Sequence, residues 1–114
     1  MSTHLFLTHE EDSAQEVQEE DWSWSCSSKV RKGDRILVYF SGVRKELVYE
    51  WIAMSDPYPG ENYPTCCHVR FVRSFDPPIS LDLSAVGAAG KGCLPADRDY
   101  LFAFGLVYAN ASSA

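Results

Sequence analysis

The stretch that decides the fold is Val30-Arg-Lys-Gly-Asp-Arg-Ile-Leu-Val-Tyr-Phe-Ser-Gly42, preceded by Trp22-Ser-Trp-Ser-Cys26. Lys32-Gly-Asp34 predicts a turn, and the near-continuous apolar run 35–40 predicts a central strand buried on both faces. Segment 21–28 is rich in serine and is expected to be a loop. Exposure of the large apolar surface of its two tryptophans to water is unfavourable, so we expect this surface to be buried, either against the protein's own core or against a flat ligand such as a nucleobase.

The segments around this stretch predict a small mixed sheet. Residues 10–20 are expected to form one short surface helix, with Thr8 or Ser13 as a possible cap. Three further strands are predicted: residues 4–8, which are buried, residues 46–54, which would pair antiparallel with 35–40, and residues 66–75, which have one polar face.

The remaining segments interrupt or end the sheet. Residues 56–64 contain three prolines and a glycine, so they are expected to be irregular. Residues 77–83 would break the sheet and begin a helical turn, and residues 87–92 would form a glycine-rich loop. Residues 100–108 are expected to form a last apolar strand or helix.

The size and composition predict one globular domain. The chain has 114 residues, of which 46% are hydrophobic and 23% charged. We expect the domain to span residues 1–108, with 109–114 as a tail or the start of a linker. No apolar run is long enough to cross a bilayer, and the N-terminus shows no secretory signal. A cytoplasmic protein with no membrane partner is therefore expected.

The charge is distributed unevenly along the chain. The net charge is −6, and residues 1–21 hold seven acidic residues and no lysine or arginine. Residues 22–75 hold eight basic and five acidic residues, a local excess of about three positive charges. Partner choice follows local fields more than the total, so this middle part could face phosphates or could simply be a solvated surface.

Signals of metal binding and catalysis are weak. The four cysteines form no Cys-x-x-Cys pair, so they are expected to be reduced and to act as small hydrophobes, with no metal site. The chain contains no phosphate-binding loop and no Gly-x-Ser-x-Gly motif, and its three histidines suggest no catalytic arrangement. We therefore expect neither an enzyme nor a cofactor.

Signals of ligand binding are stronger, because aromatic residues flank the predicted loops at the strand ends. Stacking of a base on an aromatic face contributes roughly 1–3 kcal/mol. A core role competes with this interpretation, since Trp22 or Trp24 could plug one end of a barrel and Trp51 lies on a predicted strand. The aromatic residues in question are Trp22, Trp24, Trp51, Tyr58 and Tyr63.

The order of these motifs resembles EVE domains of the PUA-like superfamily, which are related to YTH and ASCH domains. The resemblance covers roughly residues 4–83. It rests on Trp24-Ser-Cys26, Val30-Arg-Lys-Gly-Asp34, Ile36-Leu-Val-Tyr-Phe-Ser-Gly42, Ile52-Ala-Met-Ser-Asp-Pro-Tyr58, and Val69-Arg-Phe-Val72 leading to Pro78-Ile79. It implies an α+β fold, a PUA-like compact mixed β-barrel of five or six strands with one or two small helices.

The resemblance also implies an aromatic pocket, or cage, for a modified base. Trp24 would form a wall, Ser25 would add polar contacts, and Thr8 matches a position where the family often places a polar pocket residue. Glu50 and Trp51 depart from the small residues usual there, so Trp51 could supply a second wall or fill the pocket. The predicted pocket residues are Trp24, Ser25, Trp22, Cys26, Thr8, Ser41, Trp51, Tyr58 and Tyr63.

Three functions follow from these observations. The first is a module that flips a modified base, 5-methylcytosine or a related base in DNA, into the pocket, as in modification-dependent restriction enzymes, where a nuclease domain accompanies the reader. The second is an RNA-binding PUA-like, ASCH-like or YTH-like module. The third is a protein-interaction domain that uses the acidic helix. For the first, the predicted phosphate contacts are Lys29, Arg31, Lys32, Arg44 and Lys45.

Overall fold

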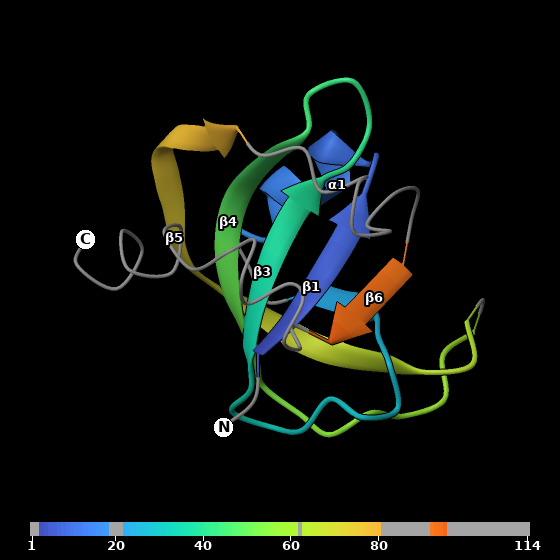
Figure 1. The fold of residues 1–114 in the computed structure, drawn as a ribbon. Coiled ribbons are helices and arrows are strands. Elements are labelled where there is room, and N and C mark those ends of the chain that lie inside the picture. The colour runs from blue at the N-terminus through green and yellow to red at the C-terminus, as the bar shows by residue number, and fades with distance from the viewer. Residues whose placement is uncertain (1–2, 19–21, 62, 81–91, 96–114) are drawn as a thin grey trace.

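The computed structural model describes residues 3–18, 22–61, 63–80 and, for the backbone alone, 92–95. These residues form a curled six-stranded sheet with the strand order β2-β5-β4-β3-β1-β6 and one short helix (Figure 1). The architecture confirms the predicted compact α+β, PUA-like fold, and its sheet curls into a half-barrel. Its elements are β1 (Thr3–Thr8), α1 (Glu11–Glu16), β2 (Trp22–Ser25), β3 (Arg35–Phe40), β4 (Glu46–Ala53), β5 (Cys66–Ser80) and β6 (Gly92–Pro95).

The centre of the sheet agrees with the prediction from the apolar run. β3 pairs parallel with β1 and antiparallel with β4. Its side chains from Ile36 to Phe40 are all buried, so both faces of this strand are covered, as the continuous apolar run predicts. The predicted strands 4–8, 35–40 and 46–54 are thereby confirmed to within one residue at each end.

The predicted turn before β3 is also confirmed. Gly33 has a φ of +91°, a conformation that side chains other than hydrogen rarely tolerate. The buried Asp34 carboxylate accepts a hydrogen bond of 2.9 Å from the backbone N–H of Arg31. The same oxygen lies 2.9 Å from Nε2 of the buried His4, so β1 is linked to the turn that starts β3.

The hydrophobic core lies inside the curl of the sheet. It joins side chains of all the strands from β1 to β5 and is closed by Ala14 and Val17, from α1 and the turn after it. Full burial contributes about 1.5–3 kcal/mol for a side chain such as Val17 and about 0.8 kcal/mol for a single methyl group such as that of Ala14. A helix of six residues is marginal alone, so α1 is held mainly by these two contacts.

The prediction that residues 21–28 form a loop is wrong for residues 22–25, which form β2. This strand pairs antiparallel with the first part of β5, with Trp24 opposite Cys67. Alternation of tryptophan and serine is a period-two pattern, which places both indoles on one face of the strand. Trp22 and Trp24 accordingly pack against the core, while Ser23 is exposed.

The prediction that Pro77 breaks the sheet is wrong, because β5 continues to Ser80. The ladder to β4 pairs Tyr49 with Ser74 and next pairs Leu47 with Ile79, so both prolines fall within a bulge of β5. Proline lacks the N–H that a regular ladder needs, and a bulge removes that requirement. Residues 81–83 of the predicted helical turn lie outside the described residues.

The helix differs from its prediction in length and cap. It begins at Glu11 and ends at Glu16, and residues 19–20 lie outside the described part. The N-cap position belongs to Glu10, and its side chain makes no capping hydrogen bond. Thr8 instead accepts a hydrogen bond of 2.9 Å from the backbone N–H of Glu10, while Ser13 lies inside the helix, so its predicted role as a cap is wrong.

The last predicted segments are mostly beyond the described residues. Residues 87–91, 100–108 and 109–114 belong to this group, whereas Gly92 begins β6 instead of ending a loop. The predicted irregular segment is confirmed for its described residues, 56–61 and 63–64, with an isolated bridge from Tyr58 to Cys66. Within the described residues, α1 is far too short to cross a membrane, and no other helix there could do so.

Candidate functional site

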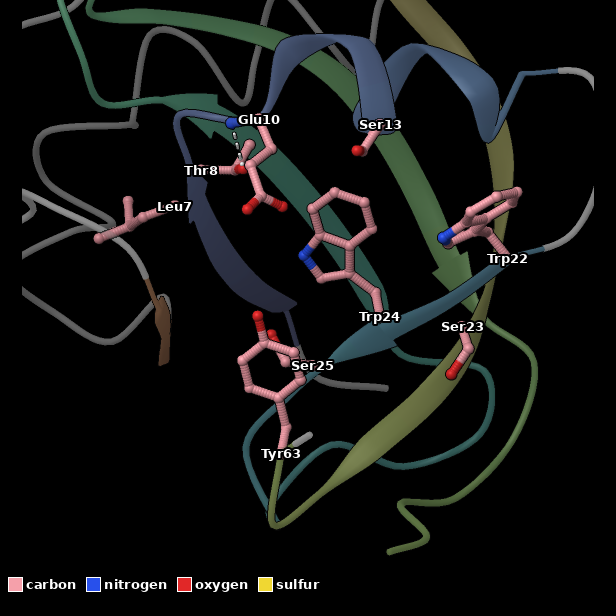
Figure 2. A pocket seen from close by; sticks show the side chains of 9 residues that line it. All are labelled: Leu7, Thr8, Glu10, Ser13, Trp22, Ser23, Trp24, Ser25 and Tyr63. Carbon is pink, nitrogen blue, oxygen red and sulfur yellow. Dashed lines mark hydrogen bonds between the residues drawn. The ribbon is translucent and has the colours of Figure 1, made fainter. Parts of the chain in front are cut away.

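A cavity of about 400 Å³ lies between the end of β1, the start of α1 and the strand β2. A volume of this size is in the range of small-molecule sites. Figure 2 shows the lining side chains, which come from both strands, from the helix and its preceding residues, and from the loop after β4. The lining residues are Leu7, Thr8, Glu10, Ser13, Trp22, Ser23, Trp24, Ser25 and Tyr63.

The aromatic wall of the cavity comes from β2. Trp22 and Trp24 are both half-buried, so each indole contacts the core on one side and the cavity on the other. The ring of Trp24 meets the ring of Trp51 edge to face, with centroids 5.1 Å apart and an interplanar angle of 68°. This contact fixes the orientation of Trp24.

Trp51 itself belongs to the core. Its side chain is 0% exposed and also meets Phe6 edge to face at 6.4 Å. It is not among the residues that line the cavity, so of the two roles open for it, filling the interior fits its position. Its indole N–H has no acceptor among the described residues, a rare condition for a buried donor.

Tyr63 lies across the cavity from the helix. It belongs to the irregular loop between β4 and β5, and 53% of its surface is exposed. Figure 2 shows its ring below Trp24, with the carboxylate of Glu10 on the other side of the opening. An exposed aromatic ring at the mouth of a cavity is available to stack on a flat ligand.

The polar rim of the cavity is built where β1 passes into α1. The hydroxyl of the buried Thr8 accepts a hydrogen bond from the backbone N–H of Glu10, which fixes the backbone of Glu10 directly before the helix. Ser13 reaches the cavity from the first turn of α1. Sequence reasoning identified Thr8 but missed Glu10, Ser13, Leu7 and Ser23. The position of Glu10, two residues after the end of the buried strand β1, was the feature of the sequence that could have identified it as a lining residue.

Besides Trp51, three predicted pocket residues do not line the cavity. Cys26 is 8% exposed and belongs to the core, and its burial raises the pKa of its thiol. Ser41 follows β3 and donates its backbone N–H to the carbonyl of Thr8 at 3.2 Å. The hydroxyl of Tyr58 lies 2.5 Å from the hydroxyl of Ser23, so it contacts a lining residue from outside the cavity.

The predicted phosphate contacts fall into two groups. Lys29, Arg31 and Lys32 are exposed on the loop between β2 and β3. The guanidinium of Arg31 donates to the carbonyls of Ser28 and Val30, both at 2.7 Å, which orders this loop. No ion pair involves Lys29 or Lys32 among the residues that the structure describes.

The second group lies at the other end of β3. Since this strand is six residues long, the two groups are separated by about 20 Å. Arg44 is bound there by two carboxylates, Glu11 at 2.8 Å and Glu46 at 2.6 Å, and these hydrogen bonds raise its pKa. Lys45 is exposed beside it with a φ of 49°. The charge of Arg44 is therefore largely compensated within the protein.

The described residues contain no group of three or more histidine, cysteine, aspartate or glutamate side chains arranged to hold a metal ion. The cavity itself offers aromatic faces, hydroxyl groups and one carboxylate. Such a set of groups is suited to holding a flat ligand with polar edges.

Comparison with known proteins finds structures of the same fold but no match in sequence. No protein-family model matches the chain, and no curated protein matches it in sequence. Several solved structures share the fold. A protein from Pseudomonas putida has a TM-score of 0.72 and 12% identity, with coverage of 95% of this chain and 98% of that one. A protein from Agrobacterium tumefaciens has a TM-score of 0.68 and 16% identity, with coverage of 93% of this chain and 92% of that one. Human THYN1 in complex with DNA containing 5-methylcytosine has a TM-score of 0.65 and 14% identity, with coverage of 95% of this chain and 97% of that one.

Proposed function

We propose that this chain is a nucleic-acid-binding module of the EVE type that holds a modified base, most favourably 5-methylcytosine in DNA, in the cavity between β1 and β2. The observation that carries the proposal is the aromatic lining of that cavity by Trp22, Trp24 and Tyr63. A base held between Trp24 and Tyr63 would gain roughly 1–3 kcal/mol of stacking from each ring.

The choice of DNA and of this modification rests on the fold. Human THYN1, which has the same fold, is known in complex with DNA that contains 5-methylcytosine. A methyl group on the base adds apolar surface, and about 0.8 kcal/mol is gained when one such carbon is buried against an indole. The module acts by binding and not by catalysis, in the cytoplasm, and a nuclease domain would accompany it in a longer protein.

A base in a duplex reaches such a cavity only after rotation out of the stack. The phosphates of the strand must then lie near basic side chains. Lys29, Arg31 and Lys32 supply these on the loop that leaves β2, the strand that carries both tryptophans of the cavity. Their contacts would position the strand, while the cavity would select the base.

The test is a titration of short duplexes that differ only in one central cytosine, which is methylated or plain. The wild-type protein should prefer the methylated duplex. Trp24→Ala should weaken binding of the methylated duplex by roughly 5- to 150-fold and remove the preference, because the stacking surface is removed. Fluorescence anisotropy of a labelled duplex measures both affinities.

Two tyrosines of one loop provide a matched pair of variants. Tyr63 lines the cavity and Tyr58 does not. Tyr63→Ala should therefore weaken binding of the methylated duplex, whereas Tyr58→Ala should leave the preference for it unchanged. An unaltered preference in both Trp24→Ala and Tyr63→Ala would contradict the proposed site.

The same base placed in single-stranded RNA separates DNA from RNA as the natural ligand. Tighter binding of the RNA would favour the RNA-reading function. Absence of binding to any of these nucleic acids at low salt would exclude both and leave the acidic N-terminal region as a protein-interaction surface.

A further inference from the structure

The charge inside the cavity is negative. Glu10 is the one charged side chain among the described residues that line the cavity, and lysine, arginine and histidine are absent from this lining. A phosphate group would be repelled from this space, since like charges repel in proportion to their proximity. A ligand edge that carries N–H donors would instead be attracted.

The backbone of Glu10 is fixed beside the cavity, and its side chain extends from there at the exposed rim. The N–H of Glu10 is held by the Thr8 hydroxyl at 2.9 Å, and the side chain makes no capping hydrogen bond to α1. Figure 2 shows the carboxylate pointing into the opening toward the indole edge of Trp24. A base stacked beside Trp24 would therefore present its polar edge to Glu10.

We infer that Glu10 accepts a hydrogen bond from the exocyclic amino group of the base, so that the cavity selects a cytosine-type base over a thymine-type base. This inference rests on the proposed function. A carboxylate has about four acceptor sites on its two oxygens and no donor, so it can receive this bond alongside others. Carboxylates are the side-chain groups that accept from the cytosine amino group.

The selection follows from what replaces that amino group. Thymine has nearly the same shape and the same methyl group as 5-methylcytosine, but it carries a carbonyl oxygen in the amino position and a hydrogen on the adjacent ring nitrogen N3. A carboxylate placed to accept from the amino group would face that carbonyl oxygen, so two acceptors would be opposed there. A site built to pair with an N–H group rejects an analogue that lacks it much more strongly than one that lacks a methyl group.

The experiment uses four duplexes in which the test base lies opposite an abasic position, so that no base has pairing to lose. The four bases are cytosine, 5-methylcytosine, uracil and thymine. The ratio of affinities between 5-methylcytosine and cytosine measures recognition of the methyl group. The ratio between 5-methylcytosine and thymine, called the amino preference below, measures recognition of the amino group together with the adjacent N3, which carries a hydrogen only in thymine. The wild-type protein should show an amino preference of roughly tenfold or more.

Glu10→Gln tests the residue directly. A glutamine amide can turn to present either its oxygen or its nitrogen, so the variant should lose most of the amino preference and keep the methyl preference. Glu16→Gln is the matched control, because it removes the same charge from the exposed end of α1 outside the cavity. This control should keep both preferences.

The outcomes separate the two proposals. Loss of the amino preference in Glu10→Gln alone supports the role of Glu10. Binding with a methyl preference but no amino preference in the wild-type protein overturns this inference and leaves the proposed function standing. An amino preference that survives in Glu10→Gln also overturns it. Absence of binding to all four duplexes overturns both.

Discussion

The cavity and the basic loop, residues 27–34 between β2 and β3, are neighbours in the chain with opposite chemistry. The cavity has aromatic walls and a single carboxylate, with no basic side chain among its described lining. The loop exposes Lys29, Arg31 and Lys32 and carries no aromatic residue. Selection of a base and attraction of a phosphate backbone are thus assigned to different side chains, so each should be removable without the other.

The comparison also predicts the direction of approach. A polyanion would be attracted by the basic loop and repelled by the acidic start of α1, where Glu10, Glu11 and Asp12 lie in succession. The strand would therefore lie over the loop, and only the base would enter the cavity. The charge of Glu11 is partly compensated, because its carboxylate lies 2.8 Å from the guanidinium of Arg44.

The largest expected effect is on the free energy of unfolding, and it tests whether Trp24 in the cavity wall contributes to stability as much as a core residue does. Trp51→Ala should lower the free energy of unfolding by about 3–5 kcal/mol, because it empties a fully buried site. Trp24→Ala should lower it by only about 1–2 kcal/mol, because that ring is half-buried. Urea denaturation of both variants measures the difference. Equal decreases would show that Trp24 is structural and would break the comparison.

A smaller effect concerns the salt dependence of binding. Lys29→Ala with Lys32→Ala should reduce the slope of log affinity against log salt by about 0.9 for each phosphate that the variant no longer neutralises. The preference for the methylated base should not change. Arg44→Ala serves as the control, and it should reduce the slope less because Glu11 and Glu46 already compensate its charge. A changed base preference in the lysine variant would contradict the separation of roles.

The smallest effect concerns Cys26, which directly follows β2 between the two regions. Burial raises the pKa of this thiol above its ordinary value of 9.0, so the reactive thiolate is scarcer at pH 8 than in an exposed cysteine. Alkylation by iodoacetamide at pH 8, followed by mass spectrometry of the peptide that contains Cys26, should be slower than for a model peptide. Equal rates would place this thiol at an accessible surface instead of in the core.

The sequence predicted the centre of the fold well, because burial on both faces leaves an unmistakable apolar run at β3. It failed at β2 because serine is common in loops, and the alternation of Trp22 and Trp24 spans only four residues. It failed at Pro77 because a bulge opposite β4 depends on register, which is a property of two strands and not of one.

The candidate site was predictable only in part for a similar reason. Trp24 and Thr8 were identified from their motifs, and both line the cavity. Glu10 was hidden in a run of acids that resembled a solvated helix face, since nothing local distinguishes the one whose carboxylate lies at the opening of the cavity. Whether Trp51 fills the interior depends on the curl of the sheet, which brings β2 over β4 through β5.

The edge-to-face contact between Trp24 and Trp51 has an optical consequence. The chain has three tryptophans, and they comprise this pair and Trp22, which lines the same cavity. Indole fluorescence moves to shorter wavelength in apolar surroundings. The fully buried Trp51 should therefore emit at shorter wavelength than the half-buried Trp22 and Trp24. A base stacked on Trp24 would quench the longer-wavelength component first. The protein thus carries its own unlabelled fluorescent reporter of whether the cavity is occupied.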